Sequence, residues 1–165
     1  DFKEASTQER KVAKVARHKK FSPSLLTYDI AILTLDRPVV FGPTVQSICL
    51  ADDSDKYIGT KATVAGWGAL NDKGNATPIL QKVEVEIWRN SQCDTSYGTR
   101  APGGILSHMM CANEVKKDSC IGDSGGPLVR SEDGYKFEQI GIVSWGIGCG
   151  LDKYPGVYTR DRKSV

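Results

Sequence analysis

The chain has no long apolar run and little net charge. No stretch of its 165 residues approaches the roughly 20 apolar residues that a membrane-spanning helix needs. The net charge of +2 is too small to indicate a nucleic-acid partner. The sequence shows neither an internal repeat nor a pattern that predicts a long helix. With 39% apolar and 25% charged residues, it is typical of a globular protein.

The cysteines do not have the spacing of a metal site. The five are Cys49, Cys93, Cys111, Cys120 and Cys149. None belongs to a Cys-x-x-Cys pair and no histidine clusters with them, so we expect neither a zinc ion nor another cofactor. A disulfide framework formed in an oxidising compartment is the better interpretation. Because the number is odd, one thiol is left free or paired outside this chain.

Short β-rich runs separated by Gly and Pro favour an all-β fold. We expect strands at residues 28–35, 39–50, 62–68, 81–88, 140–145 and 156–160, and one short helical turn at 91–97. The run 28–35 is apolar and rich in Ile, which predicts a buried strand. In the run 81–88, apolar Val83, Val85 and Ile87 alternate with charged residues, which predicts a half-buried strand.

Three polar segments have more than one interpretation. Residues 9–20 are basic, and a solvated strand with charged flanks is favoured over a heparin-like or membrane-surface patch. The acidic segment 51–56 is typical of a connection between domains. Asn75-Ala76-Thr77 is a glycosylation sequon, which fits a secreted protein. Pro78 follows it directly and disfavours occupancy, so an unmodified loop is the equal alternative.

The most informative segment is residues 118–128, Asp-Ser-Cys-Ile-Gly-Asp-Ser-Gly-Gly-Pro-Leu. Its second serine, Ser124, stands between an aspartate and two glycines. A serine hydroxyl becomes a good nucleophile when a base takes its proton and backbone N–H groups receive the oxyanion. Glycines permit the tight turns that let those N–H groups converge. A bare Gly-x-Ser-x-Gly is also typical of a surface turn, but the eleven-residue string is far more specific.

This string closely resembles the nucleophile loop of the trypsin-like (chymotrypsin-family) serine proteases, and the resemblance extends from about Lys11 to Arg160. It implies an all-β fold of two six-stranded antiparallel β-barrels. It also implies that Ser124 is the nucleophile, that the N–H groups of Gly122 and Ser124 form the oxyanion hole, and that Asp29 is the catalytic aspartate. A structural aspartate capped by backbone N–H groups is the alternative for Asp29.

The resemblance implies a pocket for a cationic side chain. Asp118 matches the position at the pocket floor, where a carboxylate selects Arg or Lys because a buried charge needs a paired charge. Gly146 and Gly156 match wall positions that must lack side chains. The other substrate-binding positions implied are Ser119, Ser144, Trp145 and Tyr158. Surface or core roles are the alternatives for each residue, but the joint agreement of three pocket positions disfavours them.

The resemblance also assigns the cysteines and Asp123. It implies the disulfides Cys93–Cys111 and Cys120–Cys149, and it matches Cys49 to a position that often bonds an upstream segment, either a propeptide or a light chain. Asp123 matches the aspartate that pairs with the new amino terminus after zymogen cleavage.

The histidine of a Ser-His-Asp mechanism is not evident. His18 and His108 both lack the Ala-Ala-His-Cys context of the catalytic histidine. We therefore expect a fragment in which residues 1–50 are the C-terminal part of an incomplete first barrel. Residues 51–165 would be a nearly complete second barrel without the family's terminal helix. The isolated chain would be inactive.

Three interpretations of the function remain open: an enzyme, a non-catalytic homologue and a structural domain. The favoured function is a secreted endopeptidase that cleaves after Arg or Lys in proteins and peptides and meets protein inhibitors. The alternative is a non-catalytic homologue that acts as a binding or regulatory module. Retention of Ser124, Asp29 and Asp118 favours the enzyme. A structural β-domain unrelated to proteolysis is the least favoured interpretation.

Overall fold

A computed structural model describes residues 6–51, 57–71, 74–115 and 118–161. The strands are β1 (Val12–Arg17), β2 (Ala31–Leu35), β3 (Cys49–Leu50), β4 (Lys61–Gly66), β5 (Gln81–Trp88), β6 (Met109–Asn113), β7 (Pro127–Ser131), β8 (Phe137–Trp145) and β9 (Gly156–Arg160). The helices are α1 (Asn90–Tyr97) and a single 3₁₀ turn at Gly98–Arg100. Most of the expected acidic connection, residues 52–56, lies outside the described residues.

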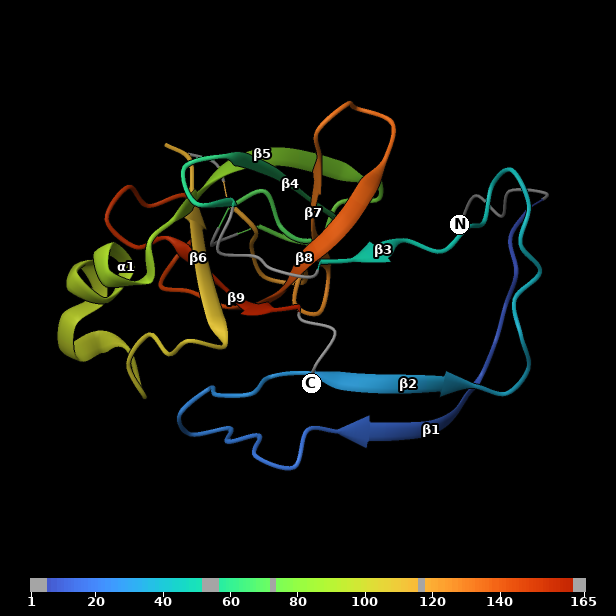
Figure 1. The fold of residues 1–165 in the computed structure, drawn as a ribbon, viewed down its shortest axis with the longest axis horizontal. Coiled ribbons are helices and arrows are strands. Elements are labelled where there is room, and N and C mark those ends of the chain that lie inside the picture. The colour runs from blue at the N-terminus through green and yellow to red at the C-terminus, as the bar shows by residue number, and fades with distance from the viewer. Residues whose placement is uncertain (1–5, 52–56, 72–73, 116–117, 162–165) are drawn as a thin grey trace.

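Six strands form a closed antiparallel barrel. They pair in the order β8-β7-β4-β5-β6-β9, and β9 pairs with β8 to close the ring. Every pairing in this ring is antiparallel. The short strand β3 adds to β8 in parallel from outside the ring. The barrel stands above the β1–β2 hairpin in Figure 1. The expected all-β fold with a six-stranded antiparallel barrel is confirmed.

The barrel core follows from the alternation in β5. Val85 and Ile87 are buried, whereas Lys82, Glu84 and Glu86 are exposed, as the sequence predicts. The inward side chains join one apolar cluster, which contributes about 25 cal/mol of stabilisation per Å² of apolar surface removed from water. Its largest fully buried members are Tyr57, Tyr158, Ile87, Met110, Leu128 and Ile140.

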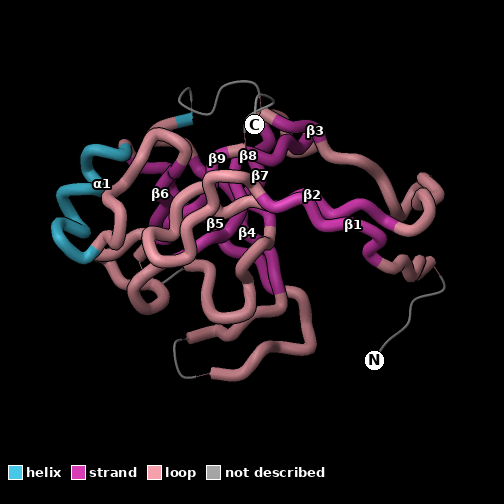
Figure 2. Tube along the Cα trace, turned by 90° about the horizontal axis from the view of Figure 1, so that it is seen from below, coloured by secondary structure: helices cyan, strands magenta, loops and turns pink. Residues whose placement is uncertain are grey.

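A second apolar cluster holds α1 against the barrel. The helix has eight residues, one more than the expected 91–97 turn, and at its start the Arg89 N–H donates to Gln92 Oε1 (3.3 Å). A disulfide joins Cys93 of the helix to Cys111 of β6. Figure 2 shows α1 at one end of the barrel and the β1–β2 hairpin extending from the other. Among the described helices, none is long and apolar enough to cross a membrane.

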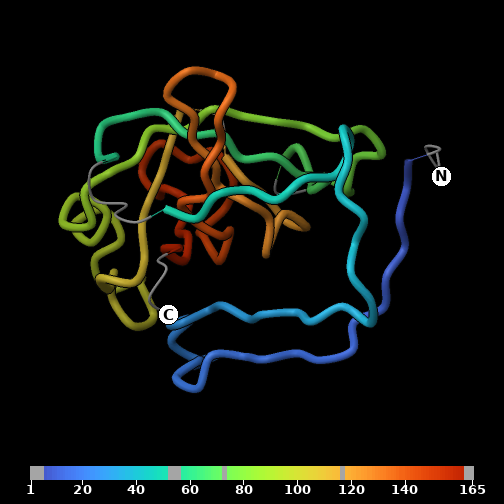
Figure 3. The backbone as a smooth tube through the Cα atoms, turned by 45° about the vertical axis from the view of Figure 1, so that its right-hand side comes forward, coloured from blue at the N-terminus to red at the C-terminus, as the bar shows by residue number. Residues whose placement is uncertain are grey.

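The hairpin differs from the sequence prediction in its burial. β2 forms within the expected run 28–35, but all of its residues are exposed, with Ile32 66% and Leu33 56% accessible. The reason is that β2 pairs only with β1, in a two-stranded sheet separate from the barrel. After β2 the chain returns to the barrel (Figure 3). Of the expected strand 39–50, Cys49–Leu50 forms a strand, and Gly42 and Val45 form an isolated bridge.

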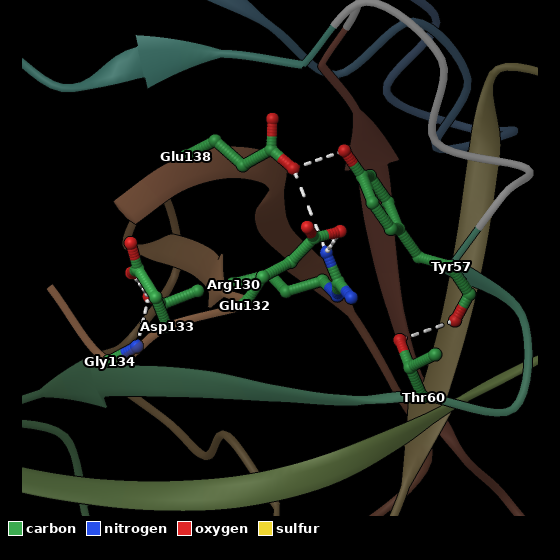
Figure 4. Close-up of polar contacts among 8 residues, drawn as sticks. Tyr57, Thr60, Arg130, Glu132, Asp133, Gly134 and Glu138 are labelled. Carbon is green, nitrogen blue, oxygen red and sulfur yellow. Dashed lines mark hydrogen bonds and ion pairs between the residues drawn. The ribbon is translucent and has the colours of Figure 1, made fainter. Parts of the chain in front are cut away.

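A polar cluster ties the turn before β4 to the β7–β8 hairpin (Figure 4). The Arg130 guanidinium lies 4.6 Å from the centre of the Tyr57 ring, and its Nη1 is 2.8 Å from Glu132 Oε1. The Tyr57 hydroxyl donates a hydrogen bond to Glu138. Because Glu138 is the register partner of Cys49, this cluster also lies beside β3.

Candidate active site

Ser124 lies on a loop of two successive tight turns before β7. The Asp123 N–H donates to the Cys120 carbonyl (3.0 Å), and the Gly126 N–H donates to the Asp123 carbonyl (2.8 Å). Gly122 (φ +98°) and Gly125 (φ +81°) have left-handed backbones that favour glycine. These turns leave Ser124 exposed where two cavities meet, since it lines both.

The Asp123 side chain anchors this loop to the end of β4. Its carboxylate accepts hydrogen bonds from the N–H of Gly68 (2.8 Å) and of Cys120 (3.0 Å). A Cβ atom at Gly66 would lie 2.0 Å from Asp123 Oδ1, and one at Gly68 would lie 2.5 Å from it. Both glycines are therefore required for the close approach. Within the described parts of the chain, no Lys, Arg or His forms an ion pair with Asp123.

A cavity of about 370 Å³ opens beside Ser124. Most of the predicted substrate-binding residues line it, namely Asp118, Ser119, Ser144, Trp145, Gly146 and Gly156. Tyr158 lies behind this lining, with its hydroxyl 3.2 Å from Ser119 Oγ. The disulfide Cys120–Cys149 joins two walls of the cavity, because both cysteines line it.

Asp118 is a partly buried carboxylate in this cavity. The N–H of Ser119 donates to its Oδ1 (2.8 Å) and the N–H of Gly150 to its Oδ2 (3.3 Å). Burial nevertheless raises the pKa of Asp118 from 3.8 to about 6, and the negative charge of Asp123 acts in the same direction. No cationic side chain among the described residues pairs with it. The cavity therefore holds a carboxylate that an incoming cation would stabilise.

Two glycines in the cavity wall differ in how tightly they are packed. A Cβ atom at Gly156 would lie 2.6 Å from Asp118 Oδ1, closer than any real contact. A Cβ atom at Gly146 would meet nothing nearer than 3.8 Å. Gly156 is thus required by the position of the carboxylate, whereas a Cβ atom at Gly146 would make only ordinary van der Waals contacts.

Asp29 lies at a second cavity, of about 410 Å³, which Ser124 also lines. Ser144 Oγ donates to Asp29 Oδ2 (2.7 Å), and Thr159 Oγ1 donates to the Asp29 carbonyl (2.8 Å). The structure thus brings Asp29 and Ser124 to one cavity although they are far apart in sequence. Its described lining, which includes Phe21, Ile142 and Val143, contains no histidine.

The two histidines of the chain lie elsewhere. His18 Nδ1 accepts a hydrogen bond from the Lys20 N–H (3.1 Å), and His108 Nε2 accepts one from the Tyr28 N–H (3.0 Å). Both imidazole rings stack on the Tyr28 ring. Neither histidine lines either of the two cavities that Ser124 lines.

The N–H groups predicted to form the oxyanion hole remain available. In the described part of the structure, neither the Gly122 N–H nor the Ser124 N–H donates to another group, whereas those of Asp123, Gly125 and Gly126 all do. Two unused donors beside a serine hydroxyl are what stabilisation of an oxyanion requires.

The remaining sequence predictions concern surface positions. Cys49 is a free, exposed thiol, and Asn75 is exposed on its loop. Within the described ranges, no three His, Cys, Asp or Glu side chains gather closely enough to hold a metal ion. Sequence reasoning missed the roles of Gly66 and Gly68 around Asp123. The sequence feature that could have indicated these roles is the position of the two glycines on either side of Trp67, at the end of an apolar run.

Together, the exposed serine, the two free N–H donors and the partly buried carboxylate form a site suited to nucleophilic attack by Ser124. The comparisons agree, since the chain matches the family model described as Trypsin over residues 2–163. It is 42% identical over 159 residues to the serine proteinase stubble of Drosophila melanogaster, covering 94% of this chain and 20% of that protein.

Two further relatives have similar identity. Transmembrane protease serine 9 of Rattus norvegicus is 42% identical over 151 residues, covering 88% of this chain and 14% of that protein. Trypsin-1 of Astacus astacus is 40% identical over 159 residues, covering 95% of this chain and 65% of that protein. The chain belongs to the trypsin family of serine proteases. It spans less than two thirds of the length of each of these relatives.

The two cavity glycines should respond differently to the same substitution. Gly156→Ala forces a Cβ atom against Asp118, so it should lower the free energy of unfolding by about 1–3 kcal/mol, as overpacking does. Gly146→Ala places its Cβ atom in ordinary van der Waals contact and should change the free energy of unfolding by less than about 0.5 kcal/mol. Urea unfolding of the complete natural protein measures both, and equal losses in the two variants would contradict this packing.

The raised pKa of Asp118 predicts a pH-dependent cost to stability. The folded state holds the Asp118 proton more tightly than the unfolded state does, so this proton stabilises the fold. The stabilisation is fully present below pH 3.8 and is lost as the pH rises through about 6. Asp118→Asn should therefore be more stable than the unmodified protein at pH 8, by about 1–3 kcal/mol, with no gain near pH 4.

Thermal or urea unfolding between pH 4 and 8 measures this difference. Asp152→Asn, at an exposed aspartate on a neighbouring loop, controls for the substitution itself. If Asp118→Asn stabilises the protein equally at pH 4 and at pH 8, burial of the Asp118 charge is not the cause.

Proposed function

We propose that this chain is part of a secreted serine endopeptidase that hydrolyses peptide bonds after Arg or Lys through an acyl-enzyme. The observation that supports this most strongly is Asp118, a partly buried carboxylate without a cationic partner in the described structure, in the cavity that Ser124 lines. An Arg or Lys side chain would supply the missing charge and would place the next peptide bond at the serine.

In the proposed reaction, Ser124 Oγ attacks the carbonyl carbon of that peptide bond while a base takes its proton. The N–H groups of Gly122 and Ser124 would hold the developing oxyanion, an interaction whose loss can cost about 10²–10³ in rate. The amine then leaves with the proton from the base. Water hydrolyses the ester on Ser124 by the same steps and regenerates the hydroxyl.

The base is proposed to come from outside this chain, oriented by Asp29. Neither His18 nor His108 lines the cavity between Asp29 and Ser124. We therefore propose that the isolated chain is inactive, because loss of the histidine alone in a related triad costs about 10⁶ in kcat. The exposed apolar side chains of β1 and β2 fit this view.

Those side chains support the proposed division of the chain. Residues 1–50 would belong to a first barrel whose other strands cover Val15, Ile32 and Leu33 in the complete protein. Residues 51–165 would form the second barrel. The cavity between Asp29 and Ser124 would then lie at the junction of the two barrels.

Asp123 is proposed to act in activation. Its carboxylate lines a further cavity of about 190 Å³, beside Gly66 and Gly68. A new amino terminus released by zymogen cleavage would enter this cavity and pair with Asp123. Such a pair would order the Gly122–Ser124 segment, since the same carboxylate already holds the Cys120 N–H.

The exposed Cys49 is proposed to bond an upstream propeptide or light chain. Protein inhibitors that present Arg or Lys are proposed as further partners. Secretion is supported by the two disulfides, which form in oxidising compartments. Glycosylation of Asn75 is consistent with its exposure, although Pro78 still disfavours it.

One observation supports the alternative of a non-catalytic homologue: the absence of a histidine from the described cavity lining. Reading the sequence upstream of Asp1 separates the two functions. An Ala-Ala-His-Cys-like segment supports the enzyme, whereas another residue at the histidine position supports a binding or regulatory module.

The activated complete protein should hydrolyse chromogenic peptides ending in Arg. Asp118→Ser should lower kcat/KM on them about 10²–10³-fold, because a cation in the pocket then lacks its partner. Steady-state kinetics on matched Arg and Phe peptides measure the preference. Equal or faster cleavage of the Phe peptide by the unmodified protein would refute this specificity.

Cys49 should be oxidised in the complete protein. Digestion without reduction, followed by mass spectrometry, should recover the Cys49 peptide bonded to an upstream peptide. Cys93–Cys111 and Cys120–Cys149 provide internal controls for the recovery of disulfide-linked peptides. A free thiol at Cys49 in that digest would defeat the proposed linkage.

A further inference from the structure

The backbone directly before Asp29 has an unfavourable conformation. Tyr28 has φ +52° and Leu26 has φ +54°, both in the left-handed region that bulky residues rarely adopt. Such a conformation persists only where surrounding contacts determine it. Because Tyr28 precedes the proposed catalytic aspartate, the contacts that hold Tyr28 also help to place the Asp29 carboxylate.

The Tyr28 ring is held between two imidazoles. The centres of the His18 and Tyr28 rings are 4.8 Å apart with 5° between their planes, and those of Tyr28 and His108 are 3.9 Å apart with 11° between theirs. His18 comes from the segment after β1, and His108 comes from the loop before β6. The stack thus joins the hairpin to the barrel.

His108 also holds the Tyr28 backbone. Its Nε2 accepts the Tyr28 N–H at 3.0 Å, which assigns the ring proton to Nδ1. The His108 backbone is fixed in turn, because its carbonyl accepts the Arg160 N–H at 2.9 Å. The adjacent Thr159 donates to the Asp29 carbonyl. Tyr28 and Asp29 are therefore both bonded to the same corner of the barrel.

The loop that carries His108 packs closely on the turn before Tyr28. A Cβ atom at Gly103 would lie 3.2 Å from Leu25 and 3.3 Å from Thr27. Thr27 itself is buried, and its carbonyl accepts the Ser22 N–H at 3.1 Å. This close packing leaves His108 little freedom to move away from Tyr28.

We propose that His108 is a positioning residue: its neutral ring holds the Tyr28 backbone, and through it the Asp29 carboxylate, and protonation of the ring releases that hold. An imidazolium has two N–H donors and no acceptor, so Nε2 can no longer receive the Tyr28 N–H. The inference rests on the proposed function, since the catalytic role of Asp29 is itself proposed.

The charges around His108 favour its neutral form. His18 faces it across the Tyr28 ring, and Lys20 Nζ lies 5.5 Å from the centre of that ring. Arg160 is bonded to its carbonyl from β9, and Asp29, one residue beyond Tyr28, is the acidic neighbour. Burial and His18 together lower the pKa of His108 from 6.5. The midpoint of this release would therefore lie below pH 6.5.

The test compares two substitutions in the activated complete protein. His108→Gln keeps an acceptor that cannot titrate in this range, whereas His108→Leu removes the acceptor. At pH 8, His108→Gln should keep kcat within about threefold, and His108→Leu should lower kcat about tenfold with KM little changed, because the Tyr28 N–H donor then lacks its acceptor. Below pH 6, kcat of the unmodified protein should fall more steeply than that of His108→Gln.

A spectroscopic measurement is independent of activity. Long-range ¹H–¹⁵N spectra should show His108 as the neutral Nδ1–H tautomer at pH 8, with a protonation midpoint below 6.5. Superimposable kcat profiles for the unmodified protein and His108→Gln, or an Nε2–H tautomer, would overturn the inference. A protein that cleaves nothing but shows the expected tautomer would instead count against the proposed function and leave the Tyr28 contact supported.

Discussion

The geometry around Ser124 depends on how the Asp123 carboxylate is held. Two backbone N–H groups, from Gly68 at the end of β4 and from Cys120 in the loop, donate to its two oxygens. The carboxylate approaches β4 so closely that neither Gly66 nor Gly68 can bear a side chain. Because Asp123 directly precedes Ser124, this contact sets the path of the loop and leaves the neighbouring N–H groups free.

The other carboxylate of the same loop is held differently. Asp118 receives two backbone N–H groups, yet burial still raises its pKa to about 6. Asp123 thus organises the loop, whereas Asp118 retains a charge that is costly until a cation arrives. The Cys120–Cys149 disulfide lies between them and fixes the wall that they share. A site that keeps one charge uncompensated gives up stability for selectivity.

The sequence predicted the elements whose patterns are local. β5 and β9 have the expected bounds, because alternation or a bounded β-rich run marks them directly. β6 was missed because all of its residues are buried, so Met109–Asn113 show no alternation. β7 was missed because it begins at Pro127, after two glycines that are typical of a turn. The exposure of β2 was not predictable, because apolarity does not reveal whether a partner strand is present.

The residues of the site were predictable where they belong to one sequence motif, but contacts between distant segments were not. The resemblance carried by the motif at residues 118–124 implied a pocket beside Ser124 with Asp118 in it, and both residues line one cavity. The contact between Tyr28 and His108 was not predictable, since the two are 80 residues apart and meet only through the docking of two loops. Close approaches such as Gly66 to Asp123 likewise depend on the assembled barrel.

The central claim is that Ser124 is a nucleophile directed by Asp118. An aryl phosphonate ester bearing an Arg-like side chain tests it most directly, because it bonds only to an activated serine next to a cation-binding pocket. After reaction with the activated complete protein, mass spectrometry should find one adduct, on the Ser124 peptide, and none when the reagent bears a Phe-like side chain. An unmodified Ser124 peptide, or an equal adduct from the Phe-like reagent, would contradict the account.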